Sequence, residues 1–225
     1  MSETQVNHNG ILETNDGVTN PVLKASAVFF SYIFHPLLLI VWVCYYLLYI
    51  NETVFLGDVS FDRLKVLLRV FGTSVFLPMV TVLLLKGLGF IDSIQLRTQK
   101  ERIIPYVACI TFFFWSYYVS KKLEDPVELR AFLLSLFICA NASLLINNYI
   151  KVSMHAMGAG GLLCLFIILL FTNKIDESVS LIAAVVTAGI ICTSRFIASN
   201  HTPYEIYIGF FVGLLLQLIC FFIVR

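Results

Sequence analysis

Long apolar runs dominate this chain and limit what it can fold into. After residue 23, short polar segments separate apolar stretches of about 20 residues, the length at which a helix crosses the hydrocarbon core of a bilayer. A helix also satisfies its own backbone hydrogen bonds there. With 59% hydrophobic and 13% charged residues, the chain has too few polar groups to cover the core of a soluble domain. The sequence therefore predicts an all-α fold, a polytopic transmembrane helix bundle.

We expect about six to seven membrane spans, because two of the candidate runs are short for a complete crossing. These two runs, 156–171 and 179–193, can form two tilted spans or one shallow hairpin, and the chain returns to the same side in both cases. Residues 1–23 are polar and predict a flexible N-terminal tail before a membrane domain at 24–225. The full set of candidate spans is 25–50, 64–85, 103–119, 131–150, 156–171, 179–193 and 204–224.

Three polar segments, 86–102, 151–155 and 194–203, are each separated from the next by two crossings. We therefore expect them to meet at one membrane face, on the side of the N-terminus. When these segments are set aside, most remaining Lys and Arg residues lie on the opposite side. Positive loops favour the cytoplasm, which predicts a site on the extracytoplasmic face, periplasmic or lumenal. Counting the three segments in full nearly removes this bias.

Charge and cysteine usage exclude several classes of function. The net charge of +1 gives no basic surface for nucleic acid, so none is expected as a partner. The six cysteines lie inside apolar runs and show no zinc or disulfide spacing. No metal or cofactor is predicted, and the expected partner at this point is the bilayer.

The segment 194–205 contains the residues with the most specific chemical pattern. If a helix begins near Thr202, Glu205 lies one turn from His201. The carboxylate can then hold one imidazole nitrogen as N–H and leave the other to attack phosphorus. Arg195 can bind two phosphate oxygens with its guanidinium group. The alternatives are a helix-capping box between Thr202 and Glu205 and ordinary interfacial polarity for His201 and Arg195.

The segment 151–155 offers a second set of polar groups before an apolar run. His155 can donate a proton to a departing alkoxide, and Ser153 and the nearby backbone N–H groups can bind phosphate oxygens. Lys151 is a further cation for the phosphate. The alternative is a helix cap followed by a stripe of small residues that packs on a neighbouring helix.

A third segment, the six residues 97–102 immediately before an apolar run, contains three cations: Arg97, Lys100 and Arg102. Such cations suit phosphate recognition and equally suit the anchoring of lipid head groups. The pair His35-Pro36 lies inside the first apolar run, where an ionisable group is uncommon. We interpret it as a kink with a neutral, hydrogen-bonded histidine.

These motifs resemble those of the type-2 phosphatidic acid phosphatase superfamily, whose third motif is Ser-Arg-x5-His-x3-Asp. Here Ser194-Arg195-x5-His201-x3-Glu205 matches it except for Glu in place of Asp. The second family motif, Pro-Ser-Gly-His, appears as Val152-Ser153-Met154-His155. The resemblance covers residues 97–205 and implies a metal-free histidine phosphatase.

The first family motif, Lys-x6-Arg-Pro, is the least well kept. Arg97 and Pro105 fit its Lys and Pro, whereas Ile104 stands in the Arg position, which Arg102 can replace. The longer side chain of Glu205 is the other departure from the family pattern.

The resemblance also implies roles for individual residues. His201 is then the nucleophile that forms a phosphohistidine, Glu205 orients it, and His155 protonates the leaving oxygen. Arg195, Ser153 and the first-motif cations bind phosphate. The expected activity is hydrolysis of a lipid phosphate or diphosphate. A lipid phosphotransferase and a non-catalytic lipid-binding relative remain as alternatives.

Overall fold

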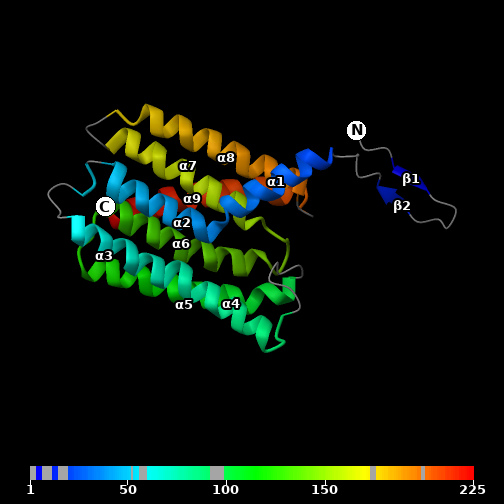
Figure 1. Cartoon of the computed structure of the whole chain (residues 1–225), viewed down its shortest axis with the longest axis horizontal. Helices are drawn as coiled ribbons and strands as arrows, with labels where there is room; N and C mark the ends of the chain where they lie inside the picture. Colours follow the sequence, from blue (N-terminus) through cyan, green and yellow to red (C-terminus); the bar gives the residue numbers. More distant parts are fainter. Residues whose placement is uncertain are drawn as a thin grey trace.

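The computed structural model describes residues 4–6, 12–14, 20–51, 53–55, 60–91, 99–172, 176–198 and 201–225. In this part of the chain the membrane domain is all-helical, as predicted (Figure 1). The N-terminal segment contains one short antiparallel pair, β1 (Thr4–Val6) and β2 (Leu12–Thr14). The first helix begins at Pro21, slightly before the predicted start of the membrane domain at residue 24.

The helices lie side by side along the longest axis of the molecule (Figure 1). Short stretches of π-helix, η1 and η2, extend the second helix and join the third to the fourth. The elements are α1 (Pro21–Ile33), α2 (Pro36–Tyr45), η1 (Tyr46–Ile50), α3 (Ser60–Phe71), η2 (Gly72–Phe76), α4 (Leu77–Gly87), α5 (Gln99–Lys122), α6 (Val127–Ile146), α7 (Met154–Thr172), α8 (Ser178–Ala198) and α9 (Pro203–Val224).

Among the described residues, six helices are long and apolar enough to cross a membrane, and a seventh span is present if α1, α2 and η1 form one bent crossing. This agrees with an integral, multi-pass membrane protein. The two short runs form separate helices, α7 of 19 residues and α8 of 21, and not a shallow hairpin. The span predicted at 131–150 lies four residues earlier, because α6 runs from Val127 to Ile146. Just after its end, the Asn147 side chain donates to the Gln99 carbonyl at 2.9 Å.

The predicted kink at His35-Pro36 is confirmed as a break of 58° between α1 and α2. Pro36 has no N–H to continue the α1 ladder, and the residue before a proline is driven out of the helical region. His35 accordingly has φ −59° and ψ 139°. Its Nδ1 accepts a hydrogen bond from the Leu37 N–H at 3.3 Å, which caps α2.

Helices α7 and α9 pack with their backbones almost in contact. A Cβ atom on Gly160 would lie 1.9 Å from the Phe210 carbonyl oxygen, and one on Gly213 would lie 2.0 Å from that of Met157. Only glycine permits such an approach, which is the packing role predicted for small residues in membrane helices. The contact brings the first turn of α7 against the first turn of α9.

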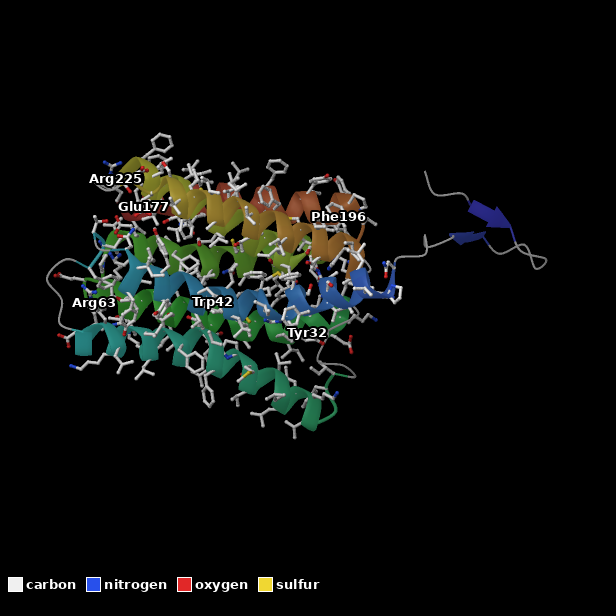
Figure 2. All side chains as sticks on the ribbon, turned by 45° about the horizontal axis from the view of Figure 1, so that its top comes forward. Tyr32, Trp42, Arg63, Glu177, Phe196 and Arg225 are labelled. Carbon is white, nitrogen blue, oxygen red and sulfur yellow. The ribbon has the colours of Figure 1, made fainter. Side chains whose placement is uncertain are left out.

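The polar segments 99–102, 151–155 and 201–205 meet at one end of the bundle, here called the site end, as the count of crossings predicted. The Arg102 guanidinium donates to the Val152 carbonyl at 3.4 Å, and the Ser153 N–H donates to the Glu205 carbonyl at 3.3 Å. Figure 2 shows Tyr32 and Phe196 toward this end, with Arg63, Glu177 and Arg225 at the other.

Buried polar groups join the helices at the opposite end. The Glu177 carboxylate, 5% exposed, accepts hydrogen bonds from Asn51 at 2.6 Å and from the Tyr46 hydroxyl. Asp125 forms an ion pair with Arg69. These contacts place three connections at the end opposite the site: the residues after η1, the start of α8 and the connection between α5 and α6. This agrees with the predicted alternation of the crossings between the two ends of the bundle.

Candidate functional site

The pair His201 and Glu205 lies at the start of α9. The Nδ1 atom of His201 is 3.0 Å from Oε2 of Glu205, and the two side chains are 6% and 16% exposed. Because a carboxylate only accepts hydrogen bonds, Nδ1 carries the proton of the neutral ring. Nε2 of His201 therefore presents a lone pair, the state that a nucleophilic imidazole requires.

Glu205 also closes a capping box on α9. Its Oε2 accepts from the Thr202 N–H at 3.0 Å, and the Thr202 hydroxyl accepts from the Glu205 N–H at 3.3 Å. The same carboxylate oxygen thus holds both the helix start and the imidazole. Both contacts predicted for Glu205, with His201 and within the capping box, are therefore present, and its role in orienting a nucleophile stays a prediction.

His201 lies between α8 and α9, outside the spanning helices. Burial lowers the pKa of its ring, and the cations Arg195 and Arg102 lower it further. The hydrogen bond and charge of Glu205 act in the opposite direction but do not outweigh burial. The neutral ring is therefore favoured at physiological pH.

His155 is in the first turn of α7 and makes its polar contact with α1. Its Nε2 is 3.2 Å from the Ser31 carbonyl oxygen. A carbonyl only accepts, so Nε2 carries a proton that it can donate. The hydroxyl of Ser31 in turn accepts from the Arg195 guanidinium at 3.0 Å. Ser31 thus connects both predicted site residues to the first helix.

Two residues at the site were missed as site residues from the sequence. The His35 ring packs edge-to-face against His155, with ring centroids 5.4 Å apart. Its place inside an apolar run was a signal, because ionisable groups there are often functional. Ser31 gave no signal, since a single serine in a membrane helix is common and only the tertiary contact reveals it.

The cations of the site come from three different segments. Arg195 is in the last turn of α8, and Arg102 is in the first turns of α5. Lys151 precedes α7, outside the spanning helices. Burial lowers its pKa, Arg102 and Arg195 lower it further, and Glu205 raises it. Arg102 and Arg195 lie near enough to influence both Lys151 and His201, so the site attracts an anion.

The remaining predicted site residues are Ser153, Lys100 and Arg97. Ser153 is 0% exposed, and its hydroxyl accepts from the Ala156 N–H at 3.4 Å, as expected of a helix cap. Its role in binding phosphate stays a prediction. Lys100 is exposed in the first turn of α5. Arg97 lies outside the described residues.

The arrangement suits the binding of a phosphoryl group. Two histidines, one offering a lone pair and one offering an N–H, share a cluster with Arg195 and Arg102. No group of three or more His, Cys, Asp or Glu residues in the described ranges is placed to hold a metal ion. Comparison of the chain with models of protein families, with characterised proteins and with solved structures finds no match.

Proposed function

We propose that this protein is a membrane phosphatase that hydrolyses a lipid phosphate or diphosphate through a phosphohistidine at one membrane face. The observation that carries the proposal is the hydrogen bond between Nδ1 of His201 and Glu205, which leaves Nε2 with its lone pair on a ring that the charges of Arg195 and Arg102 influence. The resemblance of the motifs to the type-2 phosphatidic acid phosphatase superfamily supports the same chemistry.

In the first step, Nε2 of His201 attacks phosphorus, a P–N bond forms and the bond to the leaving oxygen breaks. Arg195 and Arg102 stabilise the charge on the phosphoryl oxygens. The phosphate ester binds as its monoanion and passes its own proton to neutral His155, whose imidazolium gives a proton to the leaving oxygen; phosphate later leaves with the proton that the ester brought. Substrate oxygen then takes the place of the Ser31 carbonyl as the partner of Nε2.

In the second step, neutral His155 takes a proton from water, the resulting oxygen nucleophile attacks phosphorus and the P–N bond breaks. Phosphate leaves, and both histidines return to their starting protonation states. The Glu205 carboxylate balances the positive charge of the phosphohistidine ring while the intermediate exists. Charge and proton are thus conserved over the cycle.

The test is phosphate release from phosphatidate, a polyprenyl diphosphate and a phosphorylated glycolipid in detergent, with a chelator present. We expect the wild type to release phosphate, and His201→Ala and His155→Ala each to lose at least a hundredfold in kcat while still folding. Rapid quenching at alkaline pH traps the intermediate, and peptide mass spectrometry places the added phosphate on His201. Val185→Phe, on an exposed face of α8, is the control.

Three outcomes would contradict the proposal. A strict requirement for a divalent metal argues against histidine chemistry. Transfer of the phosphoryl group to an added alcohol or sugar, without free phosphate, makes the protein a phosphotransferase. Unchanged cellular function in His201→Ala makes it a lipid-binding relative.

The proposal includes an extracytoplasmic site, periplasmic or lumenal. Lys and Arg residues such as Arg63 and Arg225 lie at the end opposite the site (Figure 2), and positive loops favour the cytoplasm. A cysteine introduced at exposed Tyr149, beside the site end, is expected to react with a membrane-impermeant thiol reagent in intact cells or sealed vesicles. A cysteine at Arg225 is expected to be protected, and the reverse pattern would place the site in the cytoplasm.

A further inference from the structure

The bend in the first span opens a groove on the side of the bundle. Helix α1 packs along α8, whereas α2 packs against α3 and α7 (Figure 1). The 58° break thus carries α2 away from α8. The space between them has a volume of about 400 Å³, with Leu162 and Phe166 of α7 among the residues that line it.

The walls of this groove suit hydrocarbon. Trp42, 55% exposed, lies along the first span (Figure 2), and the small residues Ala183 and Ala184 leave space on α8. At the far end, the hydroxyls of Tyr46 and Ser180 are bonded to each other at 2.8 Å. A groove of this composition at the depth of the spans is filled by apolar chains and not by water.

The groove begins beside the candidate site. Its lining includes Phe34, the residue before His35, whose ring contacts His155. Ser31, one turn earlier in α1, is bonded to both Arg195 and His155. On α8, Arg195 lies about two helical turns beyond Thr187, the last residue of the lining. The cations therefore lie past one end of the apolar groove, an arrangement complementary to a molecule with an anionic head and a hydrocarbon chain.

The length of the groove fits a long chain. At about 1.5 Å per residue, the stretch from Phe34 to Tyr46 is about 18 Å long, compared with about 30 Å for the hydrocarbon core. Both residues line the groove. A chain that occupies it crosses more than half of the hydrocarbon core while its head stays at the site end.

We propose that the groove between α2 and α8 binds the hydrocarbon chain of the phosphorylated lipid whose head group occupies the site. This rests on the proposed function for the identity of the head group. The groove then makes the enzyme selective for phosphate esters with a long chain, because a short ester lacks the part that fills it.

The test fills the groove with a bulky side chain. Ala183→Phe places a ring in it, and Val185→Phe places the same ring on α8 outside the lining, at a residue that is 52% exposed. Each variant is assayed with long-chain phosphatidate and with p-nitrophenyl phosphate, which has no chain. We expect Ala183→Phe to raise KM for phosphatidate about tenfold while kcat/KM for p-nitrophenyl phosphate stays within twofold. Val185→Phe is expected to change neither.

If the two variants change KM for phosphatidate equally, or if Ala183→Phe behaves like the wild type, the groove does not bind the chain. The proposed phosphatase activity would be unaffected by either result. A direct measurement does not depend on turnover. Phosphatidate with a photoreactive group at the chain terminus is expected to label Trp42 and Phe166, and Ala183→Phe to abolish this labelling. Labels spread evenly over the exposed apolar surface would mean bulk lipid only. Failure of phosphate release in every variant, with the labels still in the groove, would reject the phosphatase and keep the lipid site.

Discussion

Replacing Glu205 with Gln removes a negative charge from the bond that orients His201 and keeps an oxygen in the same place. The amide oxygen of Gln can still accept from the Thr202 N–H, so the start of α9 keeps its cap. What changes is the strength of the bond to Nδ1 of His201, which lies 3.0 Å from the carboxylate. The substitution therefore separates the chemical role of Glu205 from its structural one.

The expected magnitude follows from the type of bond that is lost. Hydrogen bonds to a charged group contribute about 1.5–3 kcal/mol, and neutral ones about 0.5–1.5 kcal/mol. In the proposed reaction, the charge matters most when the His201 ring becomes positive as the P–N bond forms. The difference between the two ranges, about 1–1.5 kcal/mol in that state, corresponds to a decrease of about 5- to 13-fold in kcat.

The assay is phosphate release in detergent, with thermal unfolding measured on the same samples. We expect Glu205→Gln to lower kcat by this factor, with KM and the unfolding midpoint nearly unchanged. Thr202→Ala is the matched control, because it removes the hydroxyl of the cap, which costs about 1 kcal/mol of stability, and leaves the carboxylate on His201. Glu205→Asp, which keeps the charge, is expected to retain more activity than Glu205→Gln.

A Glu205→Gln protein with wild-type kcat would refute the reasoning, since the charge would then do nothing for His201. Equal losses of kcat in Thr202→Ala and Glu205→Gln would also refute it, because the effect would come from the helix cap.

Further outcomes follow from the same contacts. The pKa of His201 is lowered from its ordinary value of 6.5, so the ring stays neutral and nucleophilic below pH 6.5. We therefore expect kcat/KM, measured against pH, to fall to half at a pH below 6.5. Gly213→Ala forces a Cβ to within 2.0 Å of a carbonyl oxygen of α7. In a denaturation assay we expect it to lower the free energy of unfolding by about 1–3 kcal/mol or more. Gly189→Ala is the control, because a Cβ there meets nothing within 4 Å, and it should not destabilise the protein. His35→Asn keeps an acceptor that can cap the Leu37 N–H but removes the ring that packs on His155, so steady-state assays should show a several-fold lower kcat with an unchanged unfolding midpoint.

The parts of the fold that were predictable are those fixed by local composition. Apolar runs of spanning length gave the helices, and the parity of crossings brought His155 and His201 to one end. The spacing of His201 and Glu205 gave their contact, because a capped helix start places residues four apart on one face.

The parts that escaped prediction depend on how helices approach one another. Ser31 reaches Arg195 only because α1 packs along α8, and no periodic pattern in the sequence encodes that choice of neighbour. The groove beside Trp42 arises from a break whose existence was predictable at Pro36 but whose direction was not. Which of the cations in segment 97–102 joins the site was likewise a tertiary question, and of the described residues Arg102 contacts the segment before α7.

The glycine contact between α7 and α9 has a consequence for how the separation of the two histidines is maintained. A Cβ on Gly209 would lie 2.7 Å from the Ser153 carbonyl, so bare backbone meets bare backbone next to the start of α7. No long side chain that could change rotamer separates the two helices there. When the surrounding bilayer thickens, thins or bends, we expect α7 and α9 to tilt together, so that His155 and the residues that begin α9 keep their separation while the lipids around them rearrange.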